Sequence, residues 1–178
     1  AVRDSEHYVL TGTKAFISGG GAADLYVVMA RTGGEGARGI SAFVVEAGTP
    51  GLSFGAQERK LGWKSQPTAM VLLDGVRVPA SRRLGAEGDG FRIAMAGLDG
   101  GRVNIAACSI GGAAFALDET VRYVKERRQF GQAIGDFQVP RFRLADMATE
   151  LEAAWLMVHR AADALDRADP RATALAAA

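Results

Sequence analysis

The spacing of apolar residues changes about halfway along the chain, and this change limits the possible fold more than any other feature of the sequence. Up to Pro79, short β-branched and aromatic runs alternate with glycine-rich turns, as expected for an antiparallel sheet. Beyond Phe91, apolar residues recur every three or four positions, which is the period of a helix face. The sequence therefore predicts an α+β chain with strands first and long helices second.

The β-rich part, residues 1–84, is expected to form one domain. Residues 8–18 are interpreted as two strands joined by a tight turn at 11–13, and further strands are expected at 25–32, 39–47 and 69–79. Several strands at this spacing, with no helix between them, indicate an antiparallel sheet folded into a small barrel or a sandwich.

Two glycine clusters in this part raise the question of a phosphate-binding loop. Gly19 to Gly21 form one cluster, and Gly34 to Gly39 match the pattern G-x-G-x-x-G. A dinucleotide site needs a helix directly after such a loop, because the helix N-terminus holds the pyrophosphate. A strand pattern follows each cluster instead, so we interpret both as turns between strands.

Residues 85–178 are expected to form a helical domain. An apolar stripe from Val103 to Val124 predicts a helix that runs to about Gln129, and a second stripe runs from Leu144 to Leu165. Asp136 is the expected N-cap of the second helix, with Pro140 in its opening turn. A short connection makes the two helices antiparallel. Because two such stripes cannot enclose a core, they indicate half of an up-down four-helix bundle.

Composition excludes several classes of function. The formal net charge is +1, so nucleic acid and anionic membranes are not expected partners. No apolar run approaches the roughly 18 residues of a membrane span. His7 and His159 lack neighbours at metal-ligand spacing, so no metal site is expected. The single thiol, Cys108, indicates a reducing compartment and is interpreted as a small core residue.

Two motifs keep two interpretations each. The run Lys125 to Gly131 places three cations near a helix end, where they either complement the helix dipole or clamp an anion beside Phe130. The run Leu98 to Arg102 contains two glycines, which either break the helix or let a ligand approach its backbone, with Asp99 and Arg102 alongside.

Taken together, six segments resemble the acyl-CoA dehydrogenase family. They occur in family order and are GTKAFISGGGAADLYVVMART, GISAFVVEAGTPGLSFG, LGWKSQPT, VRVPASRRLGAEGDGFRIAM, GGRVNIAACSIGGAAFALDETVRYVKERRQFG and FRLADMATELEAAWLMVHRAA. Within the family, AFISG, GWKSQPT and GGRVNIAACSIG resemble the isobutyryl-CoA dehydrogenase branch, which acts on a short branched acyl-CoA of valine breakdown.

The resemblance implies an N-terminal helical domain, a middle β-domain and a C-terminal four-helix bundle, with FAD between the last two near a subunit interface. This chain would hold most of the middle domain and half of the bundle, and both of its ends are expected to be cut. The positions that match cofactor contacts are Phe16, Ile17 and Ser18 beside the flavin ring, with Ser18 near N5, and Arg127, Arg128, Gln129, Phe130, Phe137 and Gln138 at the diphosphate end of a neighbour's FAD.

The implied reaction is α,β-dehydrogenation, in which a carboxylate takes the α-proton, the β-hydride passes to FAD, and electron-transfer flavoprotein accepts the electrons. Asp99, Gly100, Gly101 and Arg102 match the helix segment that lines the acyl-CoA site. In most of the family the base is a glutamate beyond the second half of the bundle, and in a minority branch it occupies the position of Gly101. No catalytic residue is therefore assigned here, and the isolated chain is expected to be inactive and to bind FAD weakly or not at all.

The resemblance also implies a homotetramer or dimer, in the bacterial cytoplasm or, for a eukaryote, the mitochondrial matrix. Two alternatives remain: an acyl-CoA oxidase of the same fold, which passes electrons to oxygen, and a non-catalytic assembly module built on the paired helices.

Overall fold

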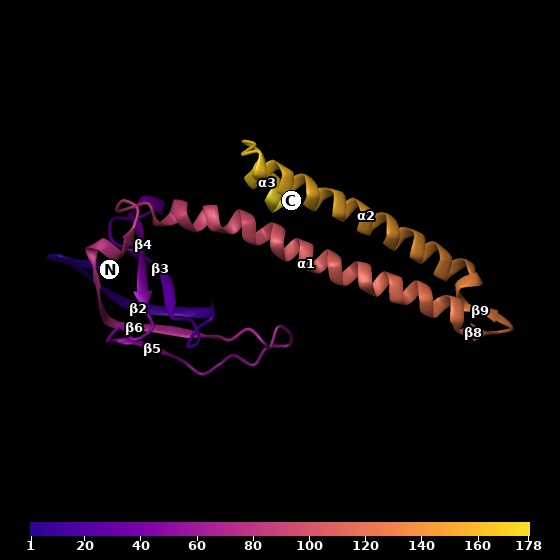
Figure 1. Ribbon diagram of the computed structural model, residues 1–178, viewed down its shortest axis with the longest axis horizontal. Coiled ribbons are helices and arrows are strands. Elements are labelled where there is room, and N and C mark those ends of the chain that lie inside the picture. Colours follow the sequence, from indigo (N-terminus) through magenta and orange to yellow (C-terminus); the bar gives the residue numbers. More distant parts are fainter. The chain divides into compact units, whose positions relative to one another are not determined.

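The computed structural model describes residues 1–178, which form two compact units, Ala1–Met95 and Ala96–Ala178. Figure 1 traces the chain from its strands to its helices. The long helix α1, Gly90–Glu126, begins in the first unit and continues through the second. The two units are described separately.

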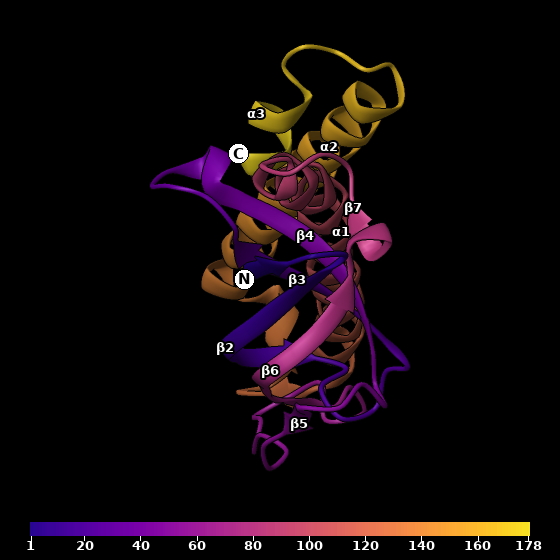
Figure 2. The same cartoon turned by 90° about the vertical axis from the view of Figure 1, so that its left-hand side faces the viewer.

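The first unit contains two antiparallel sheets. One has the order β1-β2-β6-β5 and the other β3-β4-β7; the pairing of β2 with β6 can be followed in Figure 2. The strands are β1 (Val2–Asp4), β2 (His7–Ser18), β3 (Leu25–Arg31), β4 (Ile40–Glu46), β5 (Leu52–Phe54), β6 (Thr68–Pro79) and β7 (Arg83–Leu84). The predicted α+β class and antiparallel pairing are confirmed.

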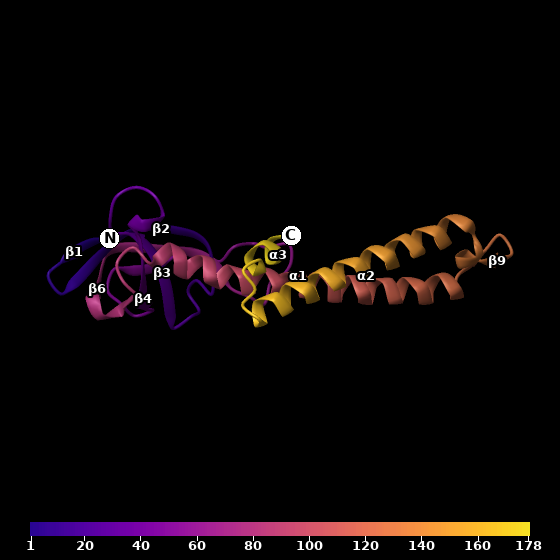
Figure 3. The same cartoon turned by 90° about the horizontal axis from the view of Figure 1, so that it is seen from above.

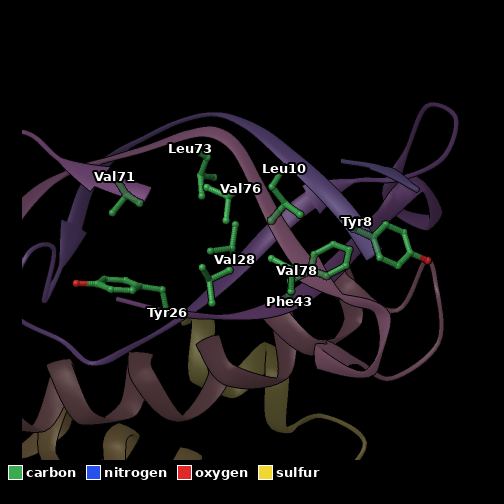
Figure 4. Packing of buried hydrophobic residues seen from close by; sticks show 10 residues of the cluster. Tyr8, Leu10, Tyr26, Val28, Phe43, Val71, Leu73, Val76 and Val78 are labelled. Carbon is green, nitrogen blue, oxygen red and sulfur yellow. The ribbon is translucent and has the colours of Figure 1, made fainter. Parts of the chain in front are cut away.

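One apolar core joins the two sheets (Figure 4). Its buried members come from alternate positions of β2, β3, β4 and β6, and they are Tyr8, Leu10, Tyr26, Val28, Phe43, Val45, Val71, Leu73, Val76 and Val78. The ring centroids of Tyr8 and Phe43 lie 4.9 Å apart across it. Since the sheets remain separate, the unit is an open sandwich, and the barrel alternative is not confirmed.

Residues 8–18 form one strand, so the predicted tight turn at 11–13 is wrong. The whole of β2 pairs with β6, and the irregularity near Gly12 is a shift in register. Opposite Thr11, β6 carries two residues, Asp74 and Gly75, and Gly75 has a φ of 63°. The glycines therefore accommodate a β-bulge within a continuous ladder.

Helix α1 starts in direct contact with β4. A Cβ placed on Gly90 would lie 2.5 Å from the carbonyl carbon of Ser41, so only glycine lets the backbones approach this closely. The buried Ser41 hydroxyl accepts the Gly88 N–H at 3.0 Å and contacts the Thr32 hydroxyl at 2.7 Å. These contacts fix the start of α1 against β4 within the first unit.

The second unit is a helical hairpin. Helix α2 (Gln138–Asp166) runs back along α1, as Figures 1 and 3 both show, and a short helix α3 (Ala172–Ala177) follows. A small hairpin of β8 (Arg128–Gln129) and β9 (Gln132–Ala133) connects the two long helices. Thus α1 ends at Glu126, three residues before the predicted end, because the chain turns into this hairpin.

Three further expectations about this unit are corrected. The N-cap of α2 is Phe137, one residue after the predicted Asp136, which lies in a short 3₁₀-helix. Helix α1 continues through Gly100 and Gly101 without a break, since two glycines cost only about 1 kcal/mol each in a helix of this length. Cys108 is exposed and is not a core residue.

Much of the apolar surface of the hairpin is uncovered. Phe115 is 69% exposed and Leu156 60% exposed, and two grooves of about 280 and 480 Å³ lie along the α1–α2 seam. Such a surface is what half of a helix bundle presents. Neither long helix is apolar enough along its length to cross a membrane.

Candidate functional site

The residues predicted to contact a cofactor in the first unit lie at a second β-bulge, near the end of β2. Lys14 pairs with Val71 and Ile17 with Ala69, so Ala15 and Phe16 together face a single residue of β6. Phe16 takes up the extra length with a φ of 56°, which is unusual for a residue other than glycine. Strain of this kind costs about 1–3 kcal/mol and is concentrated at functional positions.

The bulge decides which side chains face outward. Strand residues normally alternate between two faces, but the extra residue puts Ile17 on the same side as Lys14, where both line a cavity of about 180 Å³. Ser18 consequently lies on the outer face, where it is exposed. The Phe16 side chain is 73% exposed, and the Ser18 hydroxyl makes no hydrogen bond within the chain. The end of β2 thus offers an unused hydroxyl two residues from an exposed aromatic ring.

The glycine cluster after Ser18 is held as a fixed turn. The Tyr26 hydroxyl donates to the Gly19 carbonyl and accepts the Gly21 N–H, each at 3.1 Å. The Gln57 amide nitrogen donates to the Gly20 carbonyl at 2.8 Å. A Cβ on Gly20 would lie 3.0 Å from two carbonyl oxygens, so this position needs glycine. No helix follows, which agrees with the interpretation as a turn.

A cavity of about 1110 Å³ lies beside this turn, and the loop between β5 and β6 forms most of its wall. Three cations line it: Arg59, Lys60 and Lys64. The Lys60 ammonium donates to the Thr68 hydroxyl at 3.0 Å and to the Gln66 carbonyl. Sequence reasoning missed Lys60 and Thr68 as individual residues, although Thr68 is the last residue of the segment LGWKSQPT and Lys60 directly precedes it.

In the second unit, Asp99 and Arg102 form an ion pair on α1. The Arg102 guanidinium lies 3.2 Å from one carboxylate oxygen of Asp99, and the Thr173 hydroxyl donates to the other at 2.6 Å. A Cβ placed on Gly100 or Gly101 would meet nothing within 4 Å beyond the helix itself. Since the helix is unbroken, the two glycines leave helix backbone open to a ligand next to a polar pair.

The hairpin after α1 exposes two cations and an aromatic ring. Phe130 and Gly131 have φ values of 49° and 86°, the pattern of a type I′ turn. Neither Arg127 nor Arg128 takes part in an ion pair. The Arg128 guanidinium donates only to the Gly131 carbonyl, at 3.2 Å. Lys125 lies in the last turn of α1, and the Arg127 N–H closes the final helical hydrogen bond with the Tyr123 carbonyl at 2.9 Å, so both interpretations of this run remain open.

The aromatic and amide residues of this hairpin lie close to the two arginines in sequence. Phe130 is 93% exposed, and its ring meets that of Phe137 edge to face with centroids 6.3 Å apart. The Gln129 amide donates to the Arg128 carbonyl at 2.9 Å, and Gln138 is exposed at the start of α2. Unpaired guanidinium groups beside an exposed ring suit an anionic ligand that carries an aromatic group.

No group of three or more metal-ligating side chains occurs in the chain. The His159 ring packs against Trp155 with centroids 5.0 Å apart and the ring planes tilted by 57°, and His7 lies in β2.

Comparison with known proteins follows the same division of the chain. Residues 1–76 match the family described as "Acyl-CoA dehydrogenase, middle domain", and residues 88–178 match "Acyl-CoA dehydrogenase, C-terminal domain". The mitochondrial isobutyryl-CoA dehydrogenase of Bos taurus is 56% identical over 165 residues, which cover 93% of this chain and 40% of that protein.

Two solved structures share the fold. Butyryl-CoA dehydrogenase from Megasphaera elsdenii superposes with a TM-score of 0.93 at 44% identity, covering 99% of this chain and 46% of that one. A chain from a structural study of the electron transferring flavoprotein of Acidaminococcus fermentans gives a TM-score of 0.90 at 46% identity, covering 98% of this chain and 47% of that one. The chain thus spans less than half the length of the proteins it matches.

Proposed function

The chain belongs to the acyl-CoA dehydrogenase family, and on that premise we propose that the whole protein is an FAD-dependent dehydrogenase that introduces an α,β double bond into a short branched acyl-CoA. The 56% identity to an isobutyryl-CoA dehydrogenase supports a substrate of the isobutyryl-CoA type. Residues 1–84 would supply the middle β-domain and residues 85–178 the first half of the helical domain.

The observation that carries the proposal is the strained bulge at Phe16, after which the unpaired hydroxyl of Ser18 lies outward, two residues from an exposed ring. A flat, electron-rich heterocycle would find there a hydrogen-bond donor and an apolar surface. The residues fit FAD, which when bound supplies a ring that accepts a hydride and then passes electrons on. Phe16, Ile17 and Ser18 would hold the ring end.

The arginine-bearing hairpin fits the diphosphate of an FAD held by a neighbouring copy of the chain. Arg127 and Arg128 carry no carboxylate partner, so both are free to neutralise phosphate oxygens. Around them, Gln129, Phe130, Phe137 and Gln138 would complete the contact. This arrangement would make the protein a homo-oligomer, a dimer or a tetramer.

The substrate would lie along Asp99 to Arg102. The bare helix backbone at Gly100 and Gly101 would admit an acyl chain, and the flanking ion pair would orient polar groups of the thioester. Position 101 has no side chain to remove the α-proton, so the protein would not use the base of the minority branch. The base would be the glutamate that most of the family carries beyond the second half of the bundle. We therefore expect the 178-residue chain alone to turn over no acyl-CoA and to bind FAD weakly or not at all.

Electron-transfer flavoprotein is the proposed electron acceptor, and the bacterial cytoplasm or the mitochondrial matrix the proposed location. An acyl-CoA oxidase of the same fold is the alternative enzyme. The uncovered apolar surface of the helical hairpin supports a further alternative, a non-catalytic assembly module.

Anaerobic addition of isobutyryl-CoA to the whole protein tests the proposal. The expected result is loss of the flavin absorbance near 450 nm, which electron-transfer flavoprotein restores and oxygen restores slowly. Rapid oxygen consumption would favour the oxidase, and a protein without a flavin band would favour the assembly module. Bleaching by straight-chain butyryl-CoA alone would contradict the branched substrate.

A further inference from the structure

Ser18 has a close neighbour across the sheet that the sequence did not suggest. In the β2–β6 ladder Ser18 lies directly opposite Thr68, and the next pair is joined by the Gly19 N–H donating to the Pro67 carbonyl at 2.8 Å. Hydrogen-bonded and non-hydrogen-bonded pairs alternate in an antiparallel ladder, so Ser18 and Thr68 form a non-hydrogen-bonded pair, whose Cα atoms are typically about 4.5 Å apart. Their hydroxyls share the outer face of the sheet.

Thr68 is fixed from the opposite side by the loop between β5 and β6. Its N–H donates to the Gln57 side-chain oxygen at 2.8 Å, and its carbonyl accepts the Glu58 N–H at 2.8 Å. Its hydroxyl accepts a proton of the Lys60 ammonium at 3.0 Å, and the residue as a whole is only 9% exposed. The backbone and side chain of Thr68 are therefore both positioned by this loop.

The ammonium determines how the Thr68 hydroxyl can be used. Because a Thr68 lone pair already accepts from Lys60, the hydroxyl proton is left to donate elsewhere, and it makes no such bond within the chain. A hydroxyl that accepts from a cation is also polarised into a stronger donor. Ser18 and Thr68 thus present two unused donors on one face, with a positive charge directly behind the second.

We propose that Lys60 is a positioning residue that acts through Thr68, so that Thr68 and Ser18 form a paired donor site for the electron-rich edge of the flavin ring. This inference rests on the proposed function and deepens it, because it assigns a role to two residues outside the predicted contacts. Attraction to a cation grows with negative charge on the ligand, so the device should stabilise reduced FAD more than oxidised FAD.

The test compares two variants with two matched controls. Lys60→Met removes the ammonium but keeps the length of the side chain, and Thr68→Val removes the hydroxyl but keeps its shape. Lys64→Met removes a cation that lines the same cavity without a bond to Thr68, and Thr68→Ser keeps the hydroxyl. Thermal melts of all four variants establish that each one folds.

The first measurement needs no flavin. Nitrogen-15 NMR of lysine side chains should show a Lys60 ammonium signal in slow exchange with water, identified by its loss in Lys60→Met and distinct from that of Lys14, which donates to the Met29 carbonyl. The exchange of this signal should become faster in Thr68→Val, where only the bond to the Gln66 carbonyl is left, and should stay unchanged in Lys64→Met and in Thr68→Ser. An unprotected Lys60 ammonium in the wild-type chain would overturn the inference at its first step.

The second measurement uses the whole protein. It is the ratio of the dissociation constants of reduced and oxidised FAD, obtained by titration and from the midpoint potential of bound flavin. Lys60→Met and Thr68→Val should each lower the preference for reduced FAD about tenfold, which is about 30 mV for a two-electron couple. An unchanged ratio in these variants would refute the role of Lys60 and Thr68 while leaving the proposed function intact. Failure of the whole protein to bind FAD in either form at millimolar concentration would contradict the proposed function and, with it, this inference.

Discussion

An alanine at Gly90 should destabilise the first unit, although alanine is a better helix former than glycine. The added Cβ would lie 2.5 Å from the carbonyl carbon of Ser41, 2.8 Å from its Cα and 2.9 Å from the nitrogen of Ala42. All three atoms belong to the backbone of β4, which pairs with β3 on one side and with β7 on the other. No side chain can move aside, so the start of α1 must shift by about 1 Å to reach ordinary contact distance.

The magnitude follows from two opposing terms. Overpacking of this kind costs typically 1–3 kcal/mol, and because Gly90 is the first residue of α1, alanine recovers only a few tenths of the roughly 1 kcal/mol that it gains in a helix interior. We therefore expect Gly90→Ala to lower the free energy of unfolding of the first unit by about 1–2 kcal/mol. For a unit of this size that corresponds to a fall in melting temperature of roughly 4–16 °C.

Gly111→Ala in the same helix is the matched control, because no atom outside the helix backbone lies within 4 Å of its Cβ position. It should raise helix stability by up to about 1 kcal/mol. Circular dichroism melts give the overall effect, and hydrogen exchange of β4 (Ile40–Glu46) reports the first unit separately. A Gly90→Ala chain with wild-type melting temperature and unchanged exchange in β4 would refute the close contact between α1 and β4.

Three further predictions use the same chain. The free energy of unfolding of the Phe16→Gly variant should be about 1 kcal/mol higher than that of Phe16→Ala, because alanine keeps the strain of a positive φ and glycine does not. Equal urea midpoints for the two variants would show that the bulge is unstrained. In the whole protein, Arg127→Ala should raise the dissociation constant of FAD about ten- to a hundredfold and make that constant less sensitive to salt concentration. An unchanged dissociation constant would remove Arg127 from the site. Hydrogen bonds from the Arg171 side chain and backbone lower the pKa of Asp169 to about 2 from its ordinary 3.8. The stability that this contact gives to the turn before α3 is therefore fully present at a pH above the ordinary pKa of 3.8 and is lost as the pH falls through about 2. An NMR titration of the Asp169 carboxyl should show a midpoint at about 2, and Arg171→Ala should return that midpoint toward the ordinary pKa. A wild-type midpoint at the ordinary pKa would contradict the contact.

Local sequence patterns predicted the course of the chain because they report local forces. The change of apolar period separated strands from helices, and the strands that follow Gly21 and Gly39 identified both glycine clusters as turns. Arg127 and Arg128 are exposed in the structure, and an arginine beside a turn needs no tertiary contact to stay exposed. The cofactor roles of these residues remain predictions.

Two of the errors, at residues 11–13 and at Cys108, have one cause: the segment that decides the local structure lies elsewhere in the protein. Residues 11–13 suggested a turn because a glycine lies between two threonines. In the structure this segment stays paired with β6, and the extra residue of a β-bulge in β6 accounts for the irregularity. Cys108 suggested a core position because it is small and apolar, yet in this chain nothing covers it. Helix α1 ended early for a local reason, since Phe130 and Gly131, both at positive φ, close a two-residue turn between β8 and β9.

The amino-acid sequence by itself determined that this protein has an antiparallel β-domain, a pair of long helices and the motifs of its family, because hydrophobic period and turn chemistry act over a few residues at a time. Only the tertiary structure decided that Ser18 faces outward, that Thr68 lies opposite it and that Lys60 donates to Thr68. The first two facts depend on the bulges in the β2–β6 ladder, where the two strands contribute different numbers of residues. The third depends on the loop between β5 and β6, which brings Lys60 back to the sheet although it lies about 40 positions after Ser18. Interstrand register is a property of the assembled sheet, and no short stretch of sequence contains it.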